Sequence, residues 1–114
     1  MQIPTVQPMS PDQDVRLMEA ASNGNLEQVK KFIRSGTNIN AQDAQGITAL
    51  IFAAMAGNLD VVKVLIASGA DTQVKDKLGY DAYNAAMFFG DFRGATIEPF
   101  DKIMTALKSG ARNA

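Results

Sequence analysis

The chain has 114 residues, a formal net charge of −1, and neither cysteine nor histidine. This composition excludes disulfides, thiol nucleophiles, thiolate metal sites and histidine-based catalysis, and the near-neutral charge argues against a dedicated nucleic-acid or anionic-membrane binder. The longest apolar run, at 49–56, is 8 residues long, far below the length of a membrane span.

Residues 1–12 contain three prolines and are predicted to form an extended N-terminal leader. They have neither the basic start nor the apolar stretch of a signal peptide. As written, the sequence therefore indicates a cytoplasmic protein. The alternative is a periplasmic protein in which Met1 replaces a signal peptide that has been removed.

The first structural unit is predicted over about 13–42. An apolar helix ends at Gly24, and Asn25 is a suitable N-cap for a second helix over 26–34. Gly36 follows as the glycine that ends this second helix.

The second unit, about 43–75, repeats this order. Thr48 is expected to open a helix over 49–56, and Asn58 is expected to cap a second helix over 59–67. The second helix is apolar over a wider face than its counterpart in the first unit, as a middle unit packed on both sides requires.

The third unit, about 76–112, is longer. The glycines at 90 and 110 lie 20 residues apart, whereas those at 57 and 69 lie 12 apart. Eight residues are therefore inserted within 91–99, before a last helix predicted over about 99–108. The insertion is interpreted either as a lid over the last unit or as a second contact element for a partner. Its candidate residues are Phe92, Arg93, Ile97 and Glu98.

The three units share a fixed period. Gly24, Gly57 and Gly90 are equally spaced along the chain, and each is expected to turn it between two helices. A constant interval of this length is typical of a repeat array. The sequence thus predicts an all-α solenoid of three helix-turn-helix units, with β-turn loops between them, in one domain over 13–113.

The segment 43–71 resembles the ankyrin repeat, with the glycines at 46, 57 and 69, the threonine at 48 and the alanines at 53–54 in the family's positions. The resemblance covers roughly 14–112. Ala49 and Ile51 depart from the usual proline and histidine, and in the third unit Asp81 replaces the threonine. We therefore expect the third unit to lose hydrogen bonds that tie its loop to its helix, and to be looser or held by the insertion.

The resemblance implies a concave face made by the loop tips and the exposed side of the first helix in each unit. At matching positions this face is polar at its N-terminal end and apolar at its C-terminal end. The predicted partner-binding residues are Gln45, Ile47, Met55, Lys75, Leu78, Tyr80, Phe88 and Phe89. The alternative for Phe88 or Phe89 is packing beneath the insertion.

These features predict a non-catalytic protein-binding protein, monomeric when free, with no cofactor, no metal site and no catalytic residue. The expected partner is another protein, such as an enzyme, which the chain masks or inhibits. A sharper hypothesis, from likeness to small bacterial ankyrin proteins, is an immunity or self-protection inhibitor of an enzyme such as a cell-wall hydrolase. The alternative is a cytosolic adaptor or chaperone-like subunit that holds a partner without blocking it.

Overall fold

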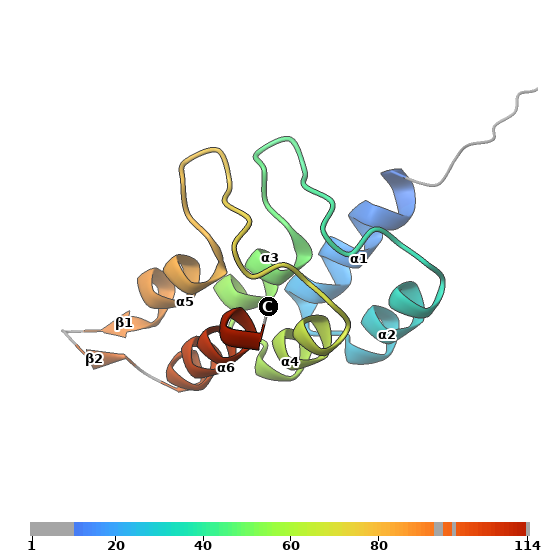
Figure 1. The fold of residues 1–114 in the computed structure, drawn as a ribbon. Helices are drawn as coiled ribbons and strands as arrows, with labels where there is room; N and C mark the ends of the chain where they lie inside the picture. The colour runs from blue at the N-terminus through green and yellow to red at the C-terminus, as the bar shows by residue number, and fades with distance from the viewer. Residues whose placement is uncertain (1–10, 93–94, 97, 114) are drawn as a thin grey trace, which may run out of the picture.

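The computed structural model describes residues 11–92, 95–96 and 98–113. This part of the chain forms three helix pairs, as the sequence predicted, in two layers (Figure 1). The helices are α1 (Pro11–Asn23), α2 (Leu26–Arg34), α3 (Ala49–Ala56), α4 (Leu59–Ala67), α5 (Ala82–Gly90) and α6 (Phe100–Asn113). Most of the predicted leader lies outside the described residues, and α1 begins at Pro11.

The first helices of the three pairs form one layer, in which α3 packs between α1 and α5. The second helices form the other layer, in which α4 packs between α2 and α6. Two long loops, between α2 and α3 and between α4 and α5, project side by side from the same edge of the array (Figure 1). This arrangement is the all-α solenoid that the period of the sequence predicted.

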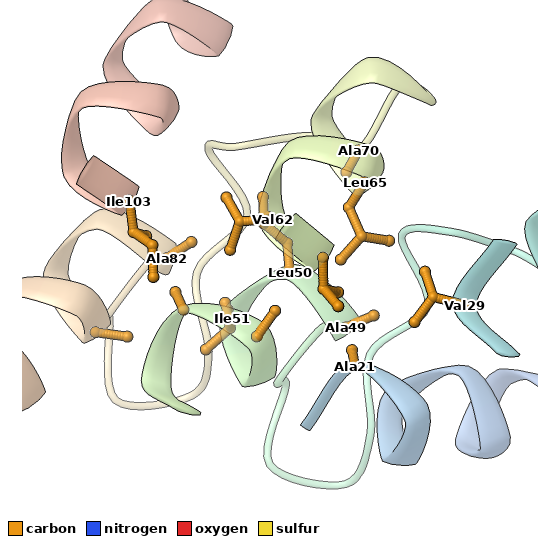
Figure 2. Close-up of a cluster of buried hydrophobic side chains, with 14 of the residues drawn as sticks. Ala21, Val29, Ala49, Leu50, Ile51, Val62, Leu65, Ala70, Ala82 and Ile103 are labelled. Carbon is orange, nitrogen blue, oxygen red and sulfur yellow. The ribbon is translucent and has the colours of Figure 1, made fainter. Parts of the chain in front are cut away.

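The core runs continuously between the two layers (Figure 2). Its middle part contains Leu50, Val61, Val62 and Leu65, which are all buried. Small side chains such as Ala53 let neighbouring helices approach closely. Each fully buried leucine or valine contributes about 1.5–3 kcal/mol to stability. All four of these side chains belong to the middle pair, α3 and α4, so this pair supplies much of the packing between repeats.

The caps of the first two helix pairs differ in one respect from the prediction. Asn25 Oδ1 accepts a hydrogen bond from the Gln28 backbone N–H (3.2 Å), and Thr48 caps α3 as expected. Asn58 makes no side-chain cap bond. Its Nδ2 instead donates to the backbone carbonyls of Ala21 (2.7 Å) and Ser22 (3.0 Å) in the preceding pair.

The predicted cap at Asn58 was therefore wrong in its chemistry, although α4 does begin at the next residue. The last carbonyls of α1 have no partner within their own helix. The side chain of Asn58 lies beside two of them, in Ala21 and Ser22, and satisfies them across the gap between repeats.

The third pair retains its helix cap, against expectation. Asn84 donates its backbone N–H to Asp81 Oδ1 (2.8 Å), and Asp81 donates its own backbone N–H to Asn84 Oδ1 (3.2 Å). This reciprocal pair is a capping box in which aspartate and asparagine replace the usual residue types. The loss of threonine at this position therefore does not remove the cap.

Gly90 was expected to turn the chain, as Gly57 does with φ 76°. It is instead the last residue of α5 and lacks a positive φ. A Cβ at Gly90 would lie 2.7 Å from Phe100 Cγ, at the start of α6. The glycine is thus required by the close approach of the Phe100 ring, and the chain turns later, through the insertion.

Two-residue strands β1 (Asp91–Phe92) and β2 (Ala95–Thr96) pair antiparallel within the insertion. The last helix then begins at Phe100 and runs to Asn113, five residues beyond the end predicted for it. Within the described residues, no helix has the length and apolar character needed to span a bilayer.

Candidate functional site: the loop tips and the exposed face of the first helices

The first projecting loop ends in a tight turn held by one carboxylate. Asp43 Oδ1 accepts hydrogen bonds from the backbone N–H groups of Gln45 and Ile47, each at 2.9 Å. Gly46 lies between them with φ 81°, a conformation that costs little only for glycine. The turn presents the Gln45 side chain to solvent and leaves Ile47 half-buried against the core.

The second loop repeats this construction at the equivalent positions of the next repeat. Asp76 Oδ1 accepts from the backbone N–H groups of Leu78 and Tyr80, again at 2.9 Å each. Gly79 adopts φ 89°. Here the two residues that bond to the carboxylate carry large apolar side chains, and Leu78 is 81% exposed.

The two loops are joined to each other. The Lys77 backbone N–H donates to the Gln45 carbonyl (2.9 Å). The Gln42 side-chain Nε2 donates to the carbonyls of Gly46 (2.9 Å) and Lys75 (3.1 Å). These bonds fix the second loop against the first, so the loop tips form one continuous surface.

The last turn of α5 carries two exposed phenylalanines. Phe88 is 73% exposed and Phe89 is 50% exposed. Their rings form an edge-to-face pair with centroids 5.2 Å apart and an interplanar angle of 86°, a favourable arrangement for aromatic pairs. Neither ring packs beneath other described residues.

The predicted partner-binding residues therefore fall into two sets. Gln45 and Lys75 are exposed and polar, whereas Ile47 and Met55 are half-buried and pack partly against the core. The remaining four are large, apolar or aromatic, and exposed. This second set, which we call the aromatic end, comprises Leu78, Tyr80, Phe88 and Phe89.

Two exposed apolar residues were missed by the sequence analysis. Met87 is 43% exposed, although the equivalent Ala54 in α3 is fully buried. Ala54 belongs to the middle pair, whereas Met87 belongs to the last described pair. This position in the array is the sequence signal that could have indicated the exposure of Met87. Val15 at the start of α1 is exposed to a similar extent.

Of the four candidate residues in the insertion, the structure describes the side chain of Glu98. Arg93 and Ile97 lie outside the described residues. Glu98 Oε2 pairs with Lys102 Nζ at 2.8 Å, and this hydrogen bond raises the pKa of Lys102. The choice between a lid and a second contact element stays a prediction.

Chemistry-bearing groups are sparse in the described chain. Its described residues contain no group of three or more aspartate or glutamate side chains placed to hold a metal ion. The carboxylates of Asp43, Asp76 and Asp81 are engaged in holding backbone N–H groups. The candidate site is the surface made by the loop tips and the exposed face of the first helices.

Comparison with known proteins places this geometry in context. A family model described as ankyrin repeats (3 copies) matches residues 17–97, which is more than half of the chain. No protein of curated function matches the chain.

Proposed function

This chain belongs to the ankyrin-repeat family of protein–protein interaction modules, and from that premise we propose that it binds one protein partner through its concave face and masks it. The family is generally non-catalytic. The proposed contact residues are those of the aromatic end, with Gln45, Ile47, Met55 and Lys75 around them. The free chain is proposed to be monomeric.

The observation that supports this proposal is the exposure of the aromatic end. Four large apolar or aromatic side chains lie at the second loop and the last turn of α5. Phe88 and Phe89 contact each other edge to face on the surface, and exposed apolar groups that gather in this way typically mark a binding site. Aromatic side chains that become buried on binding often carry most of an interface's energy. The rigid loop turns also reduce the ordering entropy lost on binding.

Masking is the mechanism proposed within this class. A concave surface with an apolar end suits a convex, partly apolar feature of the partner, such as the rim of an active site or an exposed loop. Covering that feature would inhibit an enzyme without any chemistry by this chain. In its sharpest form, the proposal is an immunity or self-protection inhibitor of an enzyme such as a cell-wall hydrolase.

The partner can be identified from the aromatic end itself. We would place a photo-crosslinking phenylalanine analogue at position 88 and, as a matched control, at exposed Lys63 on α4. Irradiation in extract from the source cells should yield an adduct from position 88 that is absent from position 63. The same adduct from both positions would contradict the proposed site.

The mechanism is then tested with the purified partner. Stoichiometric amounts of the chain should lower the partner's activity, and the Phe88→Ser/Phe89→Ser variant should lower it much less. Tight binding with full retention of activity would contradict masking and favour the adaptor role.

A further inference from the structure

A second feature of the same face lies at the other end of the array. A pocket of about 240 Å³ opens between α1 and α3, beside Asp43 of the first loop. Its apolar lining comes from Val15, Met18 and Phe52, and its acidic lining comes from Glu19 and Asp43. We call it the carboxylate pocket.

The carboxylate pocket opens on the same face as the aromatic end. Ser22, which also lines it, occupies the helix position of Met55 in the second repeat and of Phe88 in the third. These three positions are equivalent in successive repeats and share one register along the first helices. A partner that lies along this face would therefore contact both the pocket and the aromatic end.

The negative charge of the pocket is not neutralised by described basic side chains. In the described part of the chain, the ion pair is that between Lys102 and Glu98, and neither residue lines the pocket. Glu19 is exposed, and Asp43 is half-buried and uses Oδ1 to hold the loop turn. Two carboxylates thus border an apolar cavity and lack a cation from the described chain.

The size of the pocket indicates what kind of group it accepts. Small-molecule sites usually have volumes of about 300–1,000 Å³, and this one is smaller and open to solvent. A single side chain fits better than a free ligand. Lysine and arginine combine an aliphatic stem with a cationic head, and they bury the stem along apolar surface while the head stays near water.

We propose that the carboxylate pocket receives a lysine or arginine side chain of the protein partner. The stem packs on Val15, Met18 and Phe52, and the cation lies between Glu19 and Asp43. The inference rests on the proposed function, and it specifies the partner as a protein with a basic residue to one side of an apolar patch. Charge complementarity of this kind sets the orientation of the partner more than the affinity.

The test uses a small probe, so it does not depend on the partner. We would titrate isotope-labelled protein with Nα-acetyl-lysine N-methylamide and follow backbone amide shifts by NMR. Residues lining the pocket, such as Ser22 and Phe52, should shift in a saturable way with millimolar affinity. The norleucine analogue, which keeps the stem and lacks the charge, should bind more weakly, and added salt should weaken only the lysine probe.

Variants of single carboxylates test which negative charges bind the lysine probe. Glu19→Gln should weaken the lysine probe about two- to fivefold, as expected for a partly solvated ion pair. Glu27→Gln, which changes an exposed carboxylate on α2 outside the pocket, should leave the affinity unchanged. Asp43→Asn keeps the oxygen that accepts the Gln45 and Ile47 N–H groups, so it removes charge without opening the turn.

Equal shifts with the lysine and norleucine probes, or shifts centred away from the pocket, would overturn the inference. Such a result would leave the proposed function standing, because the crosslink from position 88 tests that separately. Conversely, saturable lysine binding without a crosslink from the aromatic end would support the pocket and contradict the proposed partner site.

Discussion

The second and third repeats share one backbone design and differ in what they expose. In both, a loop carboxylate holds the turn through two N–H groups at 2.9 Å. The first-helix positions occupied by Met55 and Ala56 in the second repeat are occupied by Phe88 and Phe89 in the third. The comparison teaches that the shared residues maintain the array, and that the residues that differ include those of the proposed binding surface.

The shared core should give the largest effect. Leu65 is fully buried between the helix layers, and Leu65→Ala should lower the free energy of unfolding by about 2–5 kcal/mol. Chemical denaturation followed by circular dichroism measures this loss. Leu78→Ala, at a residue 81% exposed, is the control and should be nearly neutral. A loss below about 1 kcal/mol at Leu65 would contradict the assigned core.

The next largest loss of stability is expected at Asn58, which occupies the same repeat position as Asn25 but makes different hydrogen bonds. Asn58→Ala leaves the Ala21 and Ser22 carbonyls without their cross-repeat donor, which should cost about 1–3 kcal/mol. Asn25→Ala removes only a local cap on α2 and should cost about 0.5–2 kcal/mol.

The difference between the two asparagines is sharpened by Asn58→Asp. Aspartate keeps the side-chain shape but places an oxygen against the two carbonyls. It should therefore destabilise the protein at least as much as Asn58→Ala does, as read from the denaturation midpoint. A milder effect of aspartate would mean that Asn58 acts as an ordinary helix cap.

Two equivalent turn glycines should differ as well. Both have positive φ, so alanine at either position should cost about 1–2 kcal/mol of backbone strain. A Cβ at Gly46 would also lie 3.0 Å from the Lys77 backbone nitrogen, whereas Gly79 has nothing within 4 Å. Gly46→Ala should therefore lower the unfolding midpoint more than Gly79→Ala. Equal losses of stability in the two variants would show that a side chain at position 46 does not clash with the second loop.

The sequence predicted well what depends on neighbouring residues. The bounds of α2, α3 and α4 followed from Asn25, Thr48 and the flanking glycines, because caps and turns are set by interactions a few residues apart. The constant spacing of the glycines likewise placed the first and second projecting loops and the helix layers.

What the sequence could not predict depends on contacts between distant segments. Asn58 bonds to carbonyls 36 and 37 residues away, so its local cap pattern was misleading. Gly90 matched the turn glycines in position, but its role is set by Phe100 across the insertion. For the candidate site, the repeat register indicated which aromatic residues face outward, but only the structure could place them outside the packed core.

Replacing both exposed phenylalanines of α5 should have the smallest effect on stability and a large effect on binding. Phe88→Met/Phe89→Ala gives the third repeat the residues of the second at both positions. Because both rings are exposed, the free energy of unfolding should change by less than about 0.5 kcal/mol. Binding to the crosslinked partner should weaken more than about tenfold, since aromatic anchors dominate interface energy. Calorimetric titration measures the affinity. Unfolding of the variant would assign the rings to the core, whereas unchanged affinity in a folded variant would move the binding surface away from the aromatic end.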